Sequence, residues 1–172
     1  MKAAELPRPA AVAAGWWHAL QPRPDGGGGD RASLAWLRHA ATAMDAAMEP
    51  ATLDLARRLG TGWRDLGRVA VTAAVLAHVR DDARDRPAAR QLGPTAAGDA
   101  AMSWLRFRRL MQAGTDDEQL VAFRRAVALA GGRLNVHDLA GSLLGWDDGR
   151  RRRWIMDYHN APPPTGEGNP TV

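Results

Sequence analysis

Apolar residues recur along this chain at intervals of three and four, and alternating apolar and polar runs are nearly absent. The first pattern is typical of helices that bury one face, and the second would indicate half-buried strands. Valines lie mainly inside alanine- and leucine-rich stretches with the helical period. Glycine and proline separate these stretches. The sequence therefore predicts an all-α protein, a compact helical bundle of about seven or eight helices.

Local signals indicate where several helices begin. Asp30 precedes an apolar face formed by Leu34 and Leu37, as expected of a helix cap. Thr115 and Glu118 have the spacing of a capping box. Helices are predicted over residues 9–20, 31 to about 50, 51–59, 63–84, 96–113, 116–130, from Asn135 to the turn "WDDG" at 146–149, and 150–159.

Three segments rich in proline and glycine interrupt or end this pattern. Residues 22–30 are predicted as a glycine-rich loop, and residues 85–99 as a linker or a frayed helix edge. The end of the chain, "APPPTGEGNPTV", offers almost no apolar side chain to a core. We predict a single α-helical domain over residues 1–159 and a disordered tail over 160–172.

The composition narrows the class of protein. The chain has 172 residues and no cysteine, which excludes disulfides, thiolate metal sites and a cysteine nucleophile. No apolar h-region of a signal peptide is present at the start. The longest nearly apolar run, residues 69–79, is too short to span a bilayer. We expect a cytoplasmic protein without membrane contact.

Known catalytic and ligand-binding motifs are missing. No two histidines have the i, i+4 spacing of a helical zinc site, and no Gly-Lys-Ser/Thr follows the glycines at 26–29. The acidic run 116–118 is explained as the first turn of a helix, where carboxylates are favoured. We predict no catalytic residues, no metal and no cofactor, and hence no enzyme. A helical enzyme with carboxylates from distant helices remains an alternative.

Arginine clusters are the most informative charged feature. The net charge is +4, and Lys2 is the one lysine among 23 basic residues. The planar guanidinium group pairs with phosphate oxygens through two hydrogen bonds. On a helical wheel, the arginines of "RFRR" at 106–109 turn largely away from the apolar face of Trp104 and Phe107. The run "RRRR" at 150–153 places four cations at a helix N-terminus, which disfavours them. The candidate nucleic-acid-binding residues are Arg31, Arg38, Arg106, Arg108, Arg109, Arg124 and Arg125.

Several fragments in order over residues 16–159 resemble one known family. They are "WW..L" at 16–20, "GDRA" at 29–32, "LRHA" at 37–40, "RFRRLM" at 106–111, "FRRAV" at 123–127, "NVHDLAGSLLGW" at 135–146 and "RRRWIMDYH" at 151–159. Together they resemble the CasB family, the small subunit of the type I-E CRISPR Cascade complex. The sequence departs from the family pattern at three places. The glycine-rich loop is longer, His39 stands where a second basic residue is expected, and Ser142 stands where an acidic residue is expected.

The resemblance implies an all-helical, non-catalytic protein present in two copies within Cascade. Its implied partners are the backbone and large subunits, the guide RNA and the target DNA. The seven candidate arginines would contact the guide–target duplex and the displaced non-target strand of the R-loop. This predicts binding through phosphates without sequence preference.

A stand-alone helical nucleic-acid-binding regulator is the alternative hypothesis. A helix-turn-helix reader presents donors and acceptors for base edges on a recognition helix. The arginine clusters come without a convincing Asn or Gln set for that purpose. Sequence preference in binding would distinguish the two hypotheses.

Overall fold

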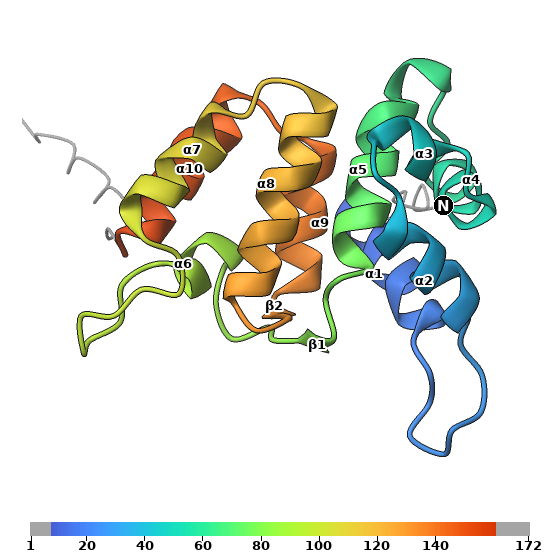
Figure 1. The fold of residues 1–172 in the computed structure, drawn as a ribbon, viewed down its shortest axis with the longest axis horizontal. Helices are drawn as coiled ribbons and strands as arrows, with labels where there is room; N and C mark the ends of the chain where they lie inside the picture. Colours follow the sequence, from blue (N-terminus) through green and yellow to red (C-terminus); the bar gives the residue numbers. More distant parts are fainter. Residues whose placement is uncertain (1–7, 161–172) are drawn as a thin grey trace, which may run out of the picture.

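The computed structural model describes residues 8–160, whose regular secondary structure is helical apart from one two-stranded sheet (Figure 1). This confirms the all-α class, with ten α-helices in that range instead of the seven or eight predicted. Of the predicted tail, only Asn160 lies within the described residues. The elements are α1 Pro9–Leu20, α2 Arg31–His39, α3 Ala43–Ala47, α4 Pro50–Leu59, the 3₁₀ helix η1 Trp63–Asp65, α5 Leu66–Leu76, β1 Asp81–Asp82, α6 Ala88–Leu92, α7 Trp104–Gln112, α8 Asp116–Leu129, β2 Arg133–Leu134, α9 Val136–Leu144 and α10 Asp148–Tyr158.

The predicted helix starts are confirmed where a capping side chain marks them. The Asp30 carboxylate accepts a hydrogen bond from the Ser33 amide at 2.9 Å. The Thr115 hydroxyl accepts from the Glu118 amide, and the Glu118 carboxylate accepts from the Thr115 amide. The Asn135 side chain caps α9 in the same way. These bonds satisfy amides that have no partner within the helix.

The single helix predicted over residues 63–84 is wrong in its second half. It consists of η1 and α5, and α5 ends at Leu76. Beyond that point the amides of Arg80 and Asp81 bond to the carbonyl of Gly132, at 2.8 and 3.2 Å. Strands β1 and β2 then pair in parallel. A tertiary contact with the turn after α8 therefore replaces the helical hydrogen bonds.

Three other predicted boundaries also differ. Residues 40–42 separate α2 from α3, so the helix predicted from 31 to 50 is divided. The predicted linker 85–99 contains α6, whose Ala88, Ala89 and Leu92 are fully buried. The helix predicted to begin near residue 96 begins at Trp104. In this last case a local turn precedes the helix, since the amide of Thr95 bonds to the carbonyl of Asp99 and the amide of Gly98 to the carbonyl of Thr95.

Helices α1–α5 form one side of the molecule and α6–α10 the other (Figure 1). Helix α5 lies where the two sides meet, and it packs against both α8 and α9 of the other side. Every residue from Val69 to Ala77 is buried, so α5 has no exposed face there. One cluster of buried residues extends from Ala13 to Tyr158. The assignment of residues 1–159 to one domain stays a prediction.

The tryptophans divide into two groups. Trp16, Trp17, Trp146 and Trp154 are buried. Indole N–H groups of three of them donate to Ala51 O, Leu76 O and Ser142 Oγ. The other three, Trp36, Trp63 and Trp104, are exposed by 64%, 79% and 47%.

Candidate nucleic-acid interface

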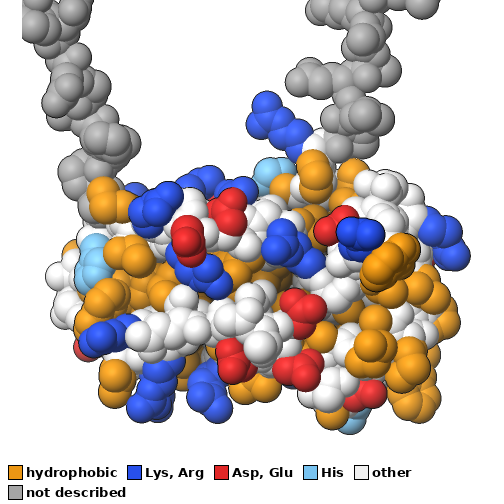
Figure 2. All heavy atoms as spheres, turned by 90° about the horizontal axis from the view of Figure 1, so that it is seen from above, with side chains coloured by type: hydrophobic (Ala, Val, Ile, Leu, Met, Phe, Trp, Pro, Cys, Tyr) orange, Lys and Arg blue, Asp and Glu red, His pale blue; other side chains and the backbone are white. Residues whose placement is uncertain are grey.

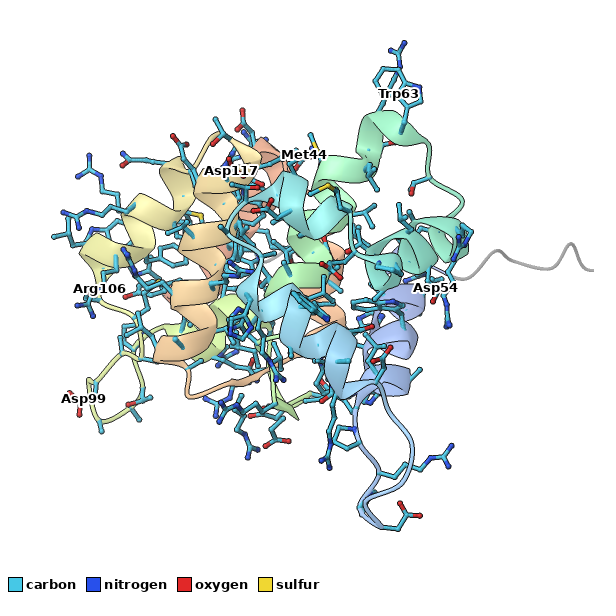
Figure 3. All side chains as sticks on the ribbon, turned by 45° about the vertical axis from the view of Figure 1, so that its right-hand side comes forward. Met44, Asp54, Trp63, Asp99, Arg106 and Asp117 are labelled. Carbon is cyan, nitrogen blue, oxygen red and sulfur yellow. The ribbon has the colours of Figure 1, made fainter. Side chains whose placement is uncertain are left out.

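Helices α7 and α8 form a hairpin with an open groove of about 550 Å³ between them. Arg106 and Arg109 of α7 and Arg125 of α8 line this groove, and the apolar side chains of Leu110 and Ala122 lie beside them. Figure 3 shows Arg106 extending outward from the side of the molecule that carries α7. Two of the predicted arginine clusters therefore meet on one surface, which we call the α7–α8 groove.

The amphipathic pattern of α7 explains why these arginines are exposed. Phe107 and Leu110 are buried, whereas Arg106, Arg108 and Arg109 lie on the solvent side. Arg108 does not line the groove. Trp104 was predicted to face the core, and this is wrong, because its side chain is half exposed. Its ring centroid lies 5.9 Å from that of Phe107 and 4.9 Å from that of His159.

The groove arginines have no ion-pair partner among the described residues. Elsewhere arginines are paired, as Arg58 is with Asp54 at 2.9 Å and Arg86 is with Asp85 at 2.9 Å. A guanidinium group without an internal acid keeps its hydrogen-bonding capacity for an external anion. The three groove arginines are therefore available for phosphate.

The acids at the groove already hold main-chain amides. The Asp117 carboxylate accepts a hydrogen bond from the Ala43 amide at 2.8 Å. The Glu118 carboxylate accepts from the Gly114 and Thr115 amides at 2.8 and 3.2 Å, and these bonds lower the pKa of Glu118. These hydrogen bonds fix the first turn of α8, and Arg125 lies further along the same helix.

Arg124 occupies a different environment from its neighbour Arg125. Its two terminal nitrogens donate to Ala40 O at 2.6 Å and Leu37 O at 2.8 Å, the carbonyls at the end of α2. Burial lowers the pKa of the Arg124 guanidinium. Cations near the end of a helix satisfy carbonyls that lack an intrahelical partner. Arg124 therefore joins α8 to α2.

Arg38 also makes an internal contact. Its Nε donates a hydrogen bond to Ala77 O at 2.6 Å. Burial lowers the pKa of the Arg38 guanidinium, and the charge of Arg80 lowers it further. His78 lies among these cations, where burial and then Arg124 and Arg38 lower its pKa to about 4. Its imidazole is consequently neutral near pH 7.

The remaining arginines lie outside the groove. Arg31 is exposed in the first turn of α2, beside the glycine-rich loop. In the run 150–153, Arg151 pairs with Asp148 at 2.9 Å, and Arg153 lies 3.5 Å from Asp138. Asp138 belongs to α9, so another helix supplies an acid to this run.

Two further features, a metal-ligand cluster and a membrane-spanning helix, are both absent from the described part of the chain. Among residues 8–160, no three His, Asp or Glu side chains gather as metal ligands would. No helix in that range combines the length and the apolar character needed to cross a bilayer.

The model of the CRISPR-associated protein Cse2 family matches residues 30–159. The chain belongs to this family. Because this is the CasB small-subunit family, the resemblance found in the sequence fragments is confirmed, and the chain is a CRISPR Cascade subunit. The Cse2 match includes all seven candidate arginines and begins after α1. Neither a curated protein nor a solved structure matches the chain.

Proposed function

We propose that this Cse2-family chain is a non-catalytic subunit that contacts the guide RNA–target DNA duplex and holds the displaced non-target strand of the R-loop. It does so through arginine–phosphate contacts. Its protein partners in this proposal are the backbone and large subunits of Cascade, with a second copy of the chain beside it.

The observation that carries the proposal is the convergence of Arg106, Arg109 and Arg125 on the α7–α8 groove. Three permanently charged groups on two rigid helices match a strand that presents phosphates at regular intervals. Arg31 and Arg108 are exposed elsewhere and would add contacts as the strand leaves the groove. Because phosphates carry no sequence information, the binding is expected to be independent of sequence.

Arg38 and Arg124 have a different place in this proposal. Their guanidinium groups already bond to main-chain carbonyls of α5 and α2. We therefore treat them as positioning residues, which hold α2 and α8 so that the exposed arginines face one strand. The candidate phosphate contacts are Arg31, Arg106, Arg108, Arg109 and Arg125.

Salt-dependent binding tests the groove. The protein is titrated against a labelled 30-nucleotide single strand of scrambled sequence across a potassium chloride series. The triple variant Arg106→Gln, Arg109→Gln, Arg125→Gln should bind more weakly, and the slope of log K against log salt should fall by about 2, at roughly 0.7 per phosphate contact.

A second triple variant controls for the lost charge. Arg57→Gln, Arg58→Gln and Arg86→Gln removes three charges outside the groove, at positions already paired with acids. This variant should retain the slope of the unmodified protein. Equal loss in both variants would refute a localised site, and a strong preference for one sequence would favour the regulator hypothesis instead.

A further inference from the structure

Large apolar side chains are exposed together around α3 and η1, at a surface that shares Asp117 with the α7–α8 groove but none of the groove arginines. Met44, Met48 and Trp63 are exposed by 70%, 65% and 79%. Met44 and Trp63 line a hollow of about 390 Å³, together with Ala43, Ala47 and Leu66. Figure 3 shows Trp63 projecting beyond the ribbon, with Met44 nearer the centre. We call this the Met44–Trp63 hollow.

Such exposure indicates an interaction surface. Single exposed apolar residues are common, but neighbouring ones around a concave surface mark binding sites. Figure 2 shows apolar side chains concentrated on the right, where Figure 1 places α3, α4 and α5. Methionine adapts its shape to a partner, and an exposed tryptophan supplies a large rigid contact area.

The frame of the hollow is rigid. The Asp117 carboxylate accepts a hydrogen bond from the Ala43 amide at 2.8 Å, which fixes the start of α3 against α8. Gly67 has no side chain, and the Asp116 carboxylate of α8 lies where its Cβ atom would be, directly against the backbone of α5. The hollow therefore exists before a partner arrives.

The charge of the hollow points to the kind of partner. Asp116 and Asp117 are its charged lining residues. Among the described residues no arginine lines the hollow itself, although the guanidinium carbon of Arg64 lies 5.1 Å from the centroid of the Trp63 ring. Four other hollows of the molecule each have at least two arginines in their linings. Two carboxylates repel a phosphate backbone and attract lysine or arginine. Nucleic acid is thus disfavoured here, and a protein segment with cationic residues is favoured.

We propose that the Met44–Trp63 hollow docks a segment of another Cascade protein that presents an apolar side chain flanked by lysine or arginine. The apolar side chain enters between Met44 and Trp63, and the cationic residue pairs with Asp116. This chain would then bind protein through one surface and phosphate through the α7–α8 groove. The inference rests on the proposed place in Cascade but not on the arginine contacts.

Reconstitution of the complex tests the surface. The tagged full chain is co-expressed with the remaining Cascade subunits and a guide RNA, and retention of the chain is measured by gel filtration over a dilution series. The double variant Met44→Ser, Trp63→Ser should dissociate at concentrations roughly 30-fold higher, as expected for truncation of a central interface tryptophan. Asp116→Asn should weaken retention in the same direction by a smaller factor.

Trp36→Ser is the matched control, since Trp36 is also exposed and does not line the hollow. It should leave retention unchanged. Unchanged retention of the double variant, or equal loss with Trp36→Ser, would overturn the proposal. If the double variant lost only its concentration-dependent self-association, the occupant would be a second copy of this chain. That result would also overturn the proposal.

A separate readout distinguishes this surface from the phosphate site. The isolated double variant should bind the labelled single strand as the unmodified chain does. Weaker strand binding by the double variant would mean that the hollow contacts nucleic acid, and the docking proposal would fail. If only the groove triple variant lost strand binding, the docking proposal would stand.

Discussion

Two adjacent arginines of α8 should respond in opposite ways to the same substitution. Arg124 bonds to the carbonyls of Ala40 and Leu37, whereas Arg125 is exposed in the α7–α8 groove. Methionine keeps most of the aliphatic stem and removes the guanidinium group. We predict that Arg124→Met destabilises the fold and that Arg125→Met weakens strand binding.

The size of the first effect follows from two hydrogen bonds. A hydrogen bond to a charged group contributes roughly 1.5–3 kcal/mol, which gives an upper range of about 3–6 kcal/mol for the pair. Arg124 is only half-buried, so water can reach the carbonyls once the guanidinium is gone. We therefore expect a loss of about 2–4 kcal/mol in the free energy of unfolding, since the released carbonyls are partly rehydrated. For a chain of this length that corresponds to a melting temperature lower by roughly 5–15 °C.

Urea and thermal denaturation followed by circular dichroism measure both variants. Arg125→Met should stay within about 0.5 kcal/mol of the unmodified protein, as usual for exposed positions. In the strand-binding assay the order should reverse, with Arg125→Met binding more weakly than Arg124→Met at a temperature where both are folded. Equal stability of the two variants would refute the assignment of Arg124 to the junction between α8 and α2.

Three further predictions concern buried features. The pKa of His78 is about 4 in the folded protein and about 6.5 in the unfolded chain. Between these pH values only the unfolded chain gains a proton, so the free energy of unfolding should fall as the pH decreases from 6.5 to 4. Urea titrations at several pH values should show a smaller loss in His78→Gln. Gly93→Ala would place a Cβ against the Tyr158 carbonyl and should cost about 1–3 kcal/mol in thermal melts, whereas Gly62→Ala faces open space and should be neutral. Ser142→Ala leaves the buried indole N–H of Trp154 without a partner and should cost about 1–3 kcal/mol by the same measurement.

The sequence predicts those parts of the fold that depend on near neighbours. Asp30 and Thr115 mark helix starts because each cap bonds to an amide three residues away. By contrast, α6 was predicted as a linker because its stability comes from elsewhere. Its first amide, at Ala88, bonds to the carboxylate of Asp138 in α9 at 2.8 Å. A contact over fifty positions leaves no local pattern.

The same limit applies to the candidate site. The sequence identifies the arginine clusters, and the ordered fragments indicate the family. It does not separate Arg124 from Arg125, because the carbonyls that bind Arg124 belong to α2. Nor does it identify the exposed Trp63, because an apolar residue on a helix gives the same pattern whether it packs on the core or faces solvent. Only the packing of the helices decides these cases.

The packing of α1 against α9 bears on how the chain folds during synthesis. Helix α1 is synthesised before α9, and helices α2–α8 lie between them in the chain. The indoles of Trp16 and Trp17 find carbonyl partners in residues 51 and 76, but the face that meets α9 has nothing to cover it until residue 144 has been added. A nascent chain that stops after α8 therefore displays an apolar strip of α1 to water. Such a truncated product is expected to associate with chaperones or to aggregate, and completion of α9 to end that exposure.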